Sequence, residues 1–90
     1  MPYISKTQRE EITKHGVPPS VPGELNFAIS SLIDQYIDNI GGLSYVSLNT
    51  IIGVLECVKL EIYRRIGAPY EDEKLIENGE VFVKTKTKKV

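Results

Sequence analysis

The sequence is poor in the residues that build most catalytic centres. It has one cysteine, Cys57, one histidine, His15, and no tryptophan among its 90 residues. A single cysteine cannot form an internal disulfide or a zinc framework, and a nucleophilic cysteine needs a base nearby. The sequence contains no Ser-His-Asp pattern, no HExxH, no P-loop and no GxGxxG. These absences predict a protein that is not an enzyme and that uses no cofactor or metal.

The chain also lacks long apolar runs. No segment approaches the roughly 18 apolar residues that span a membrane, and Met1 to Ser5 lacks the basic and then apolar pattern of a signal peptide. We therefore expect a cytoplasmic protein without a membrane partner. Hydrophobic residues make up 41% and charged residues 26% of the chain, as in a soluble globular domain. A chain of this length buries only about 60 to 65% of its unfolded surface, which favours self-association.

Positive charge is scarce outside the C-terminal end. Four of the eleven basic residues lie in the last seven positions, and all twelve acidic residues precede them. The body of the chain is therefore acidic. This argues against a nucleic-acid partner, because a nucleic-acid interface needs a broad basic face. Residues 84–90, which are mainly lysine and threonine, are predicted to form a disordered tail.

Helical periodicity dominates the remaining sequence. Ser5 and Gln8 fit a capping box, and Gly16 followed by two prolines fits a helix stop, so a short helix is predicted near residues 6–15 of an N-terminal arm, residues 1–16. Between residues 24 and 40, apolar side chains recur at helical spacing: Leu25, Ala28, Ile29, Leu32, Ile33, Tyr36, Ile37 and Ile40. Phe27 points away from this stripe, and we predict that it is an exposed oligomer contact.

A longer helix is predicted from Ser44, as its cap, to Ile66, with Pro69 closing it. The short link before Ser44 predicts an antiparallel hairpin over residues 24–67. The hairpin is followed by a C-terminal hook, residues 68–83, with a short helix, an Asn-Gly turn and an extended segment at residues 81–83. Gly53 indicates a close helix approach or a ligand near the backbone. The sequence thus predicts an all-α homo-oligomer with one domain, residues 1–83.

Lys59 lies in the apolar stripe of the predicted long helix, which consists of Leu48, Ile51, Ile52, Leu55, Ile62 and Ile66. Glu56 is three residues earlier and can form an ion pair with Lys59 on the same face. Alternatively, Lys59 contacts an anion in an oligomer cavity, where Tyr63 stacks on the ligand and Asn49 or Glu56 forms hydrogen bonds. The residues leave both interpretations open.

The densest group of cations and aromatics follows directly. It consists of Arg64, Arg65, Tyr70 and Lys74. Cations near a helix C-terminus complement the helix dipole, and Glu61 can pair with either arginine. The same residues also suit phosphate recognition by a guanidinium group, with a base stacked on Tyr63 or Tyr70.

Several segments resemble a family of small phage-encoded proteins of unknown function. They are Gly53 to Arg65, Ala68 to Asp72 with Lys74, Glu77 to Gly79, Met1 to Ile4 and Pro22 to Ile29. The resemblance covers most of residues 1–82 and implies no established activity. The predicted helical hairpin is also similar in architecture to phage sponges, which sequester nucleotide second messengers of bacterial immunity.

Two functional hypotheses follow. In the first, a non-catalytic phage counter-defence protein sequesters a cyclic nucleotide or an ADP-ribose-derived signal, with Lys59, Arg64, Arg65 and Lys74 at the phosphates. In the second, a protein-interaction module uses Phe27 and its apolar neighbours to inhibit or adapt a host protein. A nucleic-acid role for the lysine-rich tail is a third option.

Overall fold

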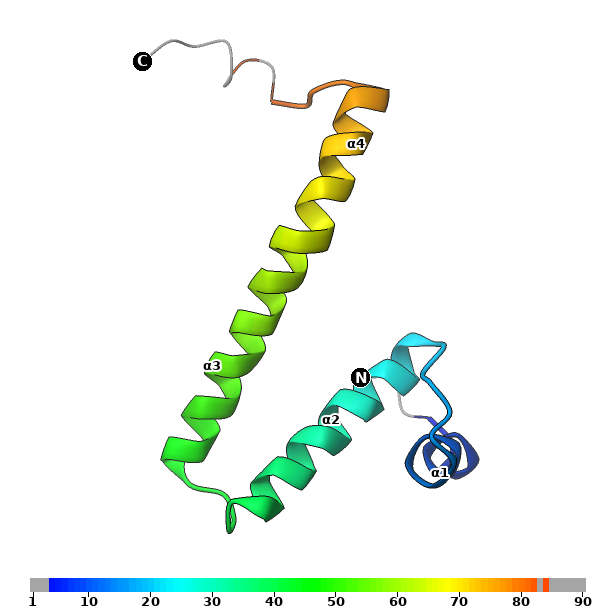
Figure 1. Cartoon of the computed structure of the whole chain (residues 1–90), viewed down its shortest axis with the longest axis vertical. Helices are drawn as coiled ribbons and strands as arrows, with labels where there is room; N and C mark the ends of the chain where they lie inside the picture. Colours follow the sequence, from blue (N-terminus) through cyan, green and yellow to red (C-terminus); the bar gives the residue numbers. More distant parts are fainter. Residues whose placement is uncertain (1–3, 83, 85–90) are drawn as a thin grey trace. The chain divides into compact units, whose positions relative to one another are not determined.

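The chain is described by a computed structural model over residues 4–82 and 84. Its elements are α1 (Lys6–His15), α2 (Pro22–Asn39), α3 (Tyr45–Ile62), the π-helical turn η1 (Tyr63–Gly67) and α4 (Ala68–Asn78), coloured in sequence order in Figure 1. No strand occurs in residues 4–82, so the predicted all-α class is confirmed for this part of the chain. Two compact units divide the chain, Met1–Ile51 and Ile52–Val90.

Helix α1 is held by local capping groups, because its own apolar content is low. The Ser5 hydroxyl accepts a hydrogen bond from the backbone N–H of Gln8, and the Gln8 side chain accepts one from the backbone N–H of Ser5. Gly16 ends the helix with a left-handed backbone, φ 65°. The predicted capping box and glycine stop are therefore confirmed. Ile12, the apolar residue of this helix, is half-buried.

Polar groups fasten α1 to the start of α2. The Gln8 Nε2 atom donates to Glu24 Oε2 at 3.0 Å, while Glu24 Oε1 accepts from the backbone N–H of Ser20 at 2.9 Å and from the Ser20 hydroxyl at 3.1 Å. Hydrogen bonds from the Ser20 backbone and from Gln8 lower the pKa of Glu24 below its ordinary value. One carboxylate thus joins α1, the proline-rich connector and α2.

Helix α2 has the predicted amphipathic pattern, but its apolar stripe is largely exposed. Leu25, Ile29, Leu32, Tyr36 and Ile40, at its C-cap, are 42 to 66% exposed. Phe27, on another side of the helix, is half-buried. Phe27 is therefore less exposed than the sequence predicted, while its role as an oligomer contact stays a prediction. The apolar surface that α2 presents is the stripe itself.

Helix α3 begins at a reciprocal pair of serines. The Ser47 backbone N–H donates to Ser44 Oγ at 3.1 Å, and the Ser44 backbone N–H donates to Ser47 Oγ at 2.7 Å. Ser44 is thus the cap that the sequence predicted. Ser47 and Ile51 lie one turn apart and are 6% and 7% exposed. Among the large apolar side chains that the structure describes, Ile51 is the one that is buried.

Pro69 does not close the helix that starts at α3, contrary to the sequence-based prediction. The Ala68 N–H donates to the Tyr63 carbonyl, five residues back, and the helical backbone continues through Gly67 and Ala68 into α4. Proline lacks an N–H and its ring clashes with a carbonyl four residues earlier in a regular helix. The wider π-helical turn accommodates Pro69 at the first turn of α4, where a missing N–H costs little.

Gly53 has open space around it in α3. An added Cβ atom would meet no heavy atom within 4 Å among the atoms described. The close helix approach that the sequence suggested at Gly53 is therefore not observed among the described residues. Many other α3 side chains are also exposed, including Val46 at 76%, Ile52 at 59% and Leu60 at 57%.

The C-terminal part follows the predicted turn. Gly79 has φ 89° and its N–H donates to the Leu75 carbonyl at 2.8 Å, which ends α4 after Asn78. Val81 and Phe82 form no strand, and Val83 lies outside the described residues. The predicted disordered tail, residues 84–90, also lies outside them apart from Lys84. Within the described part, no helix combines the length and apolar content that crossing a membrane requires.

Candidate functional site

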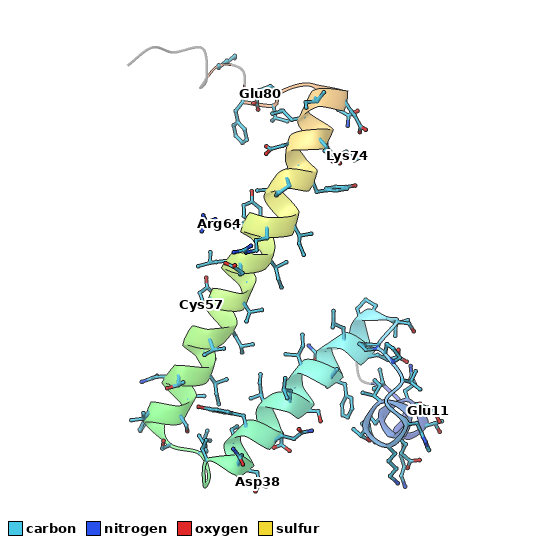
Figure 2. All side chains as sticks on the ribbon, in the orientation of Figure 1. Glu11, Asp38, Cys57, Arg64, Lys74 and Glu80 are labelled. Atoms are coloured by element: carbon cyan, nitrogen blue, oxygen red, sulfur yellow. The ribbon has the colours of Figure 1, made fainter. Side chains whose placement is uncertain are left out.

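The candidate residues lie along α3, η1 and α4, whose side chains are drawn in Figure 2. Lys59 Nζ lies 3.4 Å from Glu56 Oε1, and the two side chains are 72% and 56% exposed. The ion pair that the sequence suggested is present, and the lysine is not buried. Because an exposed pair of this kind contributes about 0 to 1 kcal/mol, Lys59 can exchange Glu56 for another anion at little cost. Asn49, two turns before Glu56, is also exposed.

The two arginines of η1 differ in their partners. Arg65 forms an ion pair with Glu61 one turn earlier. Arg64, labelled in Figure 2, forms no ion pair or side-chain hydrogen bond with the described residues. A guanidinium group carries a permanent charge and five donors in a planar fork, so Arg64 is the cation of this turn that is free to bind an anion.

Lys74 and Tyr70 interact with each other on α4. The Lys74 ammonium lies 5.5 Å from the centre of the Tyr70 ring and 3.0 Å from Glu77 Oε2. The cation–π contact and the ion pair both hold Lys74 along the helix. Tyr70 remains 58% exposed.

Tyr63 is anchored across the π-helical turn. A Cβ atom at Gly67 would lie 3.0 Å from Tyr63 Cδ1, so the ring packs directly on the glycine backbone. A hydrogen bond to the Glu71 carboxylate and the negative charge of Glu71 raise the pKa of Tyr63 above its ordinary value. Gly67 is therefore needed for space rather than for an unusual backbone angle, since its φ is −65°.

A hollow of about 370 Å³ lies between the start of α4 and the segment after it. Its lining includes Tyr63, Glu71, Asp72, Lys74, Leu75 and Phe82. Of the eight candidate residues, the hollow brings together Tyr63 and Lys74, and the other six lie outside its lining. The sequence did not place Asp72 and Phe82 beside one hollow; the Asn-Gly turn before Phe82 was the signal that could have brought them together.

The described residues contain no group of three or more His, Cys, Asp or Glu side chains that could hold a metal ion. Cys57 is an exposed free thiol on α3. The arrangement along α3, η1 and α4 thus offers exposed cations, aromatic rings and one shallow hollow. These features suit the binding of a ligand.

Comparison with known proteins identifies the family of the chain. No curated protein and no solved structure matches it. A family model described as a domain of unknown function, DUF6899, matches residues 1–81. The chain therefore belongs to the DUF6899 family.

Proposed function

We propose that the protein is a phage counter-defence binding protein that self-associates and sequesters a nucleotide-type immune signal without chemical conversion. The observation that carries this proposal is the unpaired Arg64 on η1. It lies on the same short stretch of helix as Lys59 and Arg65, whose exposed carboxylate partners a phosphate could replace.

The ligand would carry phosphate and a stacking base. A phosphate group accepts two parallel hydrogen bonds from a guanidinium fork, which makes Arg64 the first contact. Tyr63 and Tyr70 are 56% and 58% exposed and provide rings for stacking on a base. Lys59, Arg65 and Lys74 add positive charge around this contact.

Self-association is the second part of the proposal. The apolar stripe of α2, defined by Leu25, Ile29, Leu32, Tyr36 and Ile40, is exposed, and so are apolar side chains on several sides of α3. A helix that is apolar nearly all round is normally buried. The stripe of α2 and the exposed apolar side chains of α3 would each be buried if a second copy of the chain packed on them.

Calorimetric titration with cyclic oligonucleotides and ADP-ribose derivatives tests the signal. We expect saturable binding of one of these ligands to the wild type and at least tenfold weaker binding to Arg64→Ala. Lys14→Ala removes the same charge from α1 and is expected to leave the affinity unchanged. Absence of binding heat with the whole panel, or equal losses in both variants, would contradict the proposal.

Light scattering after gel filtration tests self-association. Leu32 is 66% exposed, so Leu32→Asp should leave an isolated chain folded but lower the mass of an oligomer. Ser30→Asp, at an exposed position on the side of α2 that also carries Asp34, is the control and should keep the mass of the wild type. A monomeric wild type would refute this part of the proposal.

The exposed stripe of α2 also favours the alternative function, a protein-interaction module. Its contact surface would then be the stripe rather than the half-buried Phe27. A stoichiometric host protein that is recovered with the wild type and with Arg64→Ala, but not with Leu32→Asp, would support the alternative.

A further inference from the structure

We propose that Asn78 is a site of spontaneous deamidation and that the end of α4 controls the rate of this modification. Asn78 is the last residue of α4, and Gly79 is its C-cap. Neither residue belongs to the proposed ligand contact or to the apolar stripe of α2. Asn78 is exposed, and its side chain forms no hydrogen bond with a described residue. Its amide group is therefore open to reaction with the neighbouring backbone.

The reaction joins the Asn78 side chain to the next peptide unit. The backbone nitrogen of Gly79 loses its proton to a solvent base and attacks the side-chain carbonyl carbon of Asn78, which forms a C–N bond. The Cγ–Nδ2 bond then breaks, and Nδ2 takes a proton from solvent and leaves as ammonia. One water molecule opens the resulting five-membered imide ring, which yields aspartate or isoaspartate. Glycine favours the attack because it has no Cβ atom to crowd the nitrogen.

The folded end of α4 holds this reaction back. The Gly79 N–H donates to the Leu75 carbonyl at 2.8 Å, which is a well-formed backbone hydrogen bond. A nitrogen held in this bond loses its proton less readily, and the helical backbone of Asn78 does not align its side-chain carbon with that nitrogen. The last turn of α4 must therefore open before the ring can close. Helix ends open locally at a small cost in free energy, so the local stability of α4 sets the rate.

The other three asparagines of the chain provide an internal comparison. Asn26, Asn39 and Asn49 lie within α2 and α3. Each precedes a residue with a bulky or branched side chain, which crowds the attacking nitrogen. The same chain thus contains one asparagine that combines a helix end with a following glycine and three that do not.

The product changes the end of α4 permanently. A carboxylate at position 78 adds negative charge at the C-terminus of the helix, which the helix dipole disfavours, and it lies close in sequence to Glu77 and Glu80. Isoaspartate also lengthens the backbone by one carbon atom, so the hydrogen bond from Gly79 to Leu75 loses its register. Deamidation therefore records in covalent form that the end of α4 has opened.

Mass spectrometry of the full chain after incubation at neutral pH, with peptide mapping, measures the rate at each asparagine. Ile76 is 85% exposed, so its replacement changes the opening of α4 without removing a buried side chain. Ile76→Ala is the reference variant. We expect deamidation about fivefold faster in Ile76→Gly and at least about tenfold faster in Ile76→Pro, because glycine weakens a helix and proline interrupts it. The acceleration should be confined to Asn78.

The proposal is overturned if no variant deamidates, if the three Ile76 variants react at equal rates, or if another asparagine reacts as fast as Asn78. Should Ile76→Pro unfold the whole chain, the comparison of Ile76→Gly with Ile76→Ala decides. Asn78→Gln should lose the modification, because ring closure from glutamine requires a less favourable six-membered ring. A modification that persists in Asn78→Gln would place the reactive residue elsewhere.

Discussion

Replacement of Gly53 by alanine should stabilise the protein. A glycine inside a helix costs about 1 kcal/mol relative to alanine, because it loses more backbone freedom on folding. The new Cβ atom would meet no described atom within 4 Å, so no packing cost offsets the gain. For a chain of this length, 1 kcal/mol corresponds to a rise in Tm of about 4 to 8 °C.

Gly67→Ala is the matched comparison, because Gly67 also has a helical backbone, with φ −65° and ψ −51°. Its Cβ atom would lie 3.0 Å from Tyr63 Cδ1, so the ring must move and its hydrogen bond to Glu71 would be strained. Overpacking typically costs about 1 to 3 kcal/mol, which cancels or exceeds the gain in helix propensity. We therefore expect an unchanged or lower Tm for this variant.

Thermal unfolding followed by circular dichroism, with the oligomer mass measured in parallel, provides the assay. The reasoning about Gly53 fails if Gly53→Ala lowers Tm or reduces the oligomer mass. Such a result would mean that another helix or subunit packs on the Gly53 backbone. The reasoning about Gly67 fails if Gly67→Ala raises Tm as much as Gly53→Ala does.

Three further predictions concern polar contacts. Ser5→Ala removes the cap of α1 and should speed hydrogen exchange of the α1 amides about fivefold, equivalent to about 1 kcal/mol; unchanged exchange would show that the cap does not hold the helix. The lowered pKa of Glu24 adds stability that is complete above its ordinary value of 4.5 and is lost as the pH falls through the folded value. Urea unfolding should therefore show an advantage of the wild type over Glu24→Gln at pH 7 that decreases as the pH falls below 4.5, and an advantage that does not change with pH would refute this linkage. The raised pKa of Tyr63 adds stability that is present below its ordinary value of 10.0 and lost as the pH rises through the folded value. The stability advantage of the wild type over Tyr63→Phe should thus disappear above about pH 10, and an advantage that grows there would contradict the assigned hydrogen bond.

Features with short-range causes could be predicted from the sequence. The capping box of Ser5 and Gln8, the stop at Gly16 and the cap at Ser44 each depend on side chains within a few residues of the backbone groups that they satisfy. The pair of Glu56 and Lys59 is equally local, because residues three apart share a helix face. The helical periodicity of residues 24–40 gave the extent of α2 to within two residues.

Features that depend on the continuation of the chain could not be predicted in this way. Pro69 signals a helix end, but the helix continues because the turn before Pro69 is π-helical and wider than a regular turn. Within that turn, Gly67 leaves space for the Tyr63 ring. Periodicity placed Phe27 away from the apolar stripe but could not show that its side chain is half-buried. The hollow needs the chain to turn at Gly79 and return over α4, and a turn signal alone does not specify which helix face the returning segment covers.

The π-helical turn η1 also sets the rotational phase of α4. Each residue of a regular helix advances the side chains by about 100°, so one residue accommodated in a wider turn rotates everything after it by about that angle. Deleting one residue from Tyr63–Gly67 would remove the wider turn, set the Pro69 ring against a carbonyl of the preceding turn, and rotate the side chains of α4 by a similar amount relative to those before the turn. A related sequence that is one residue shorter at this point would thus present different α4 side chains on a given side of the helix, although every residue of α4 is unchanged.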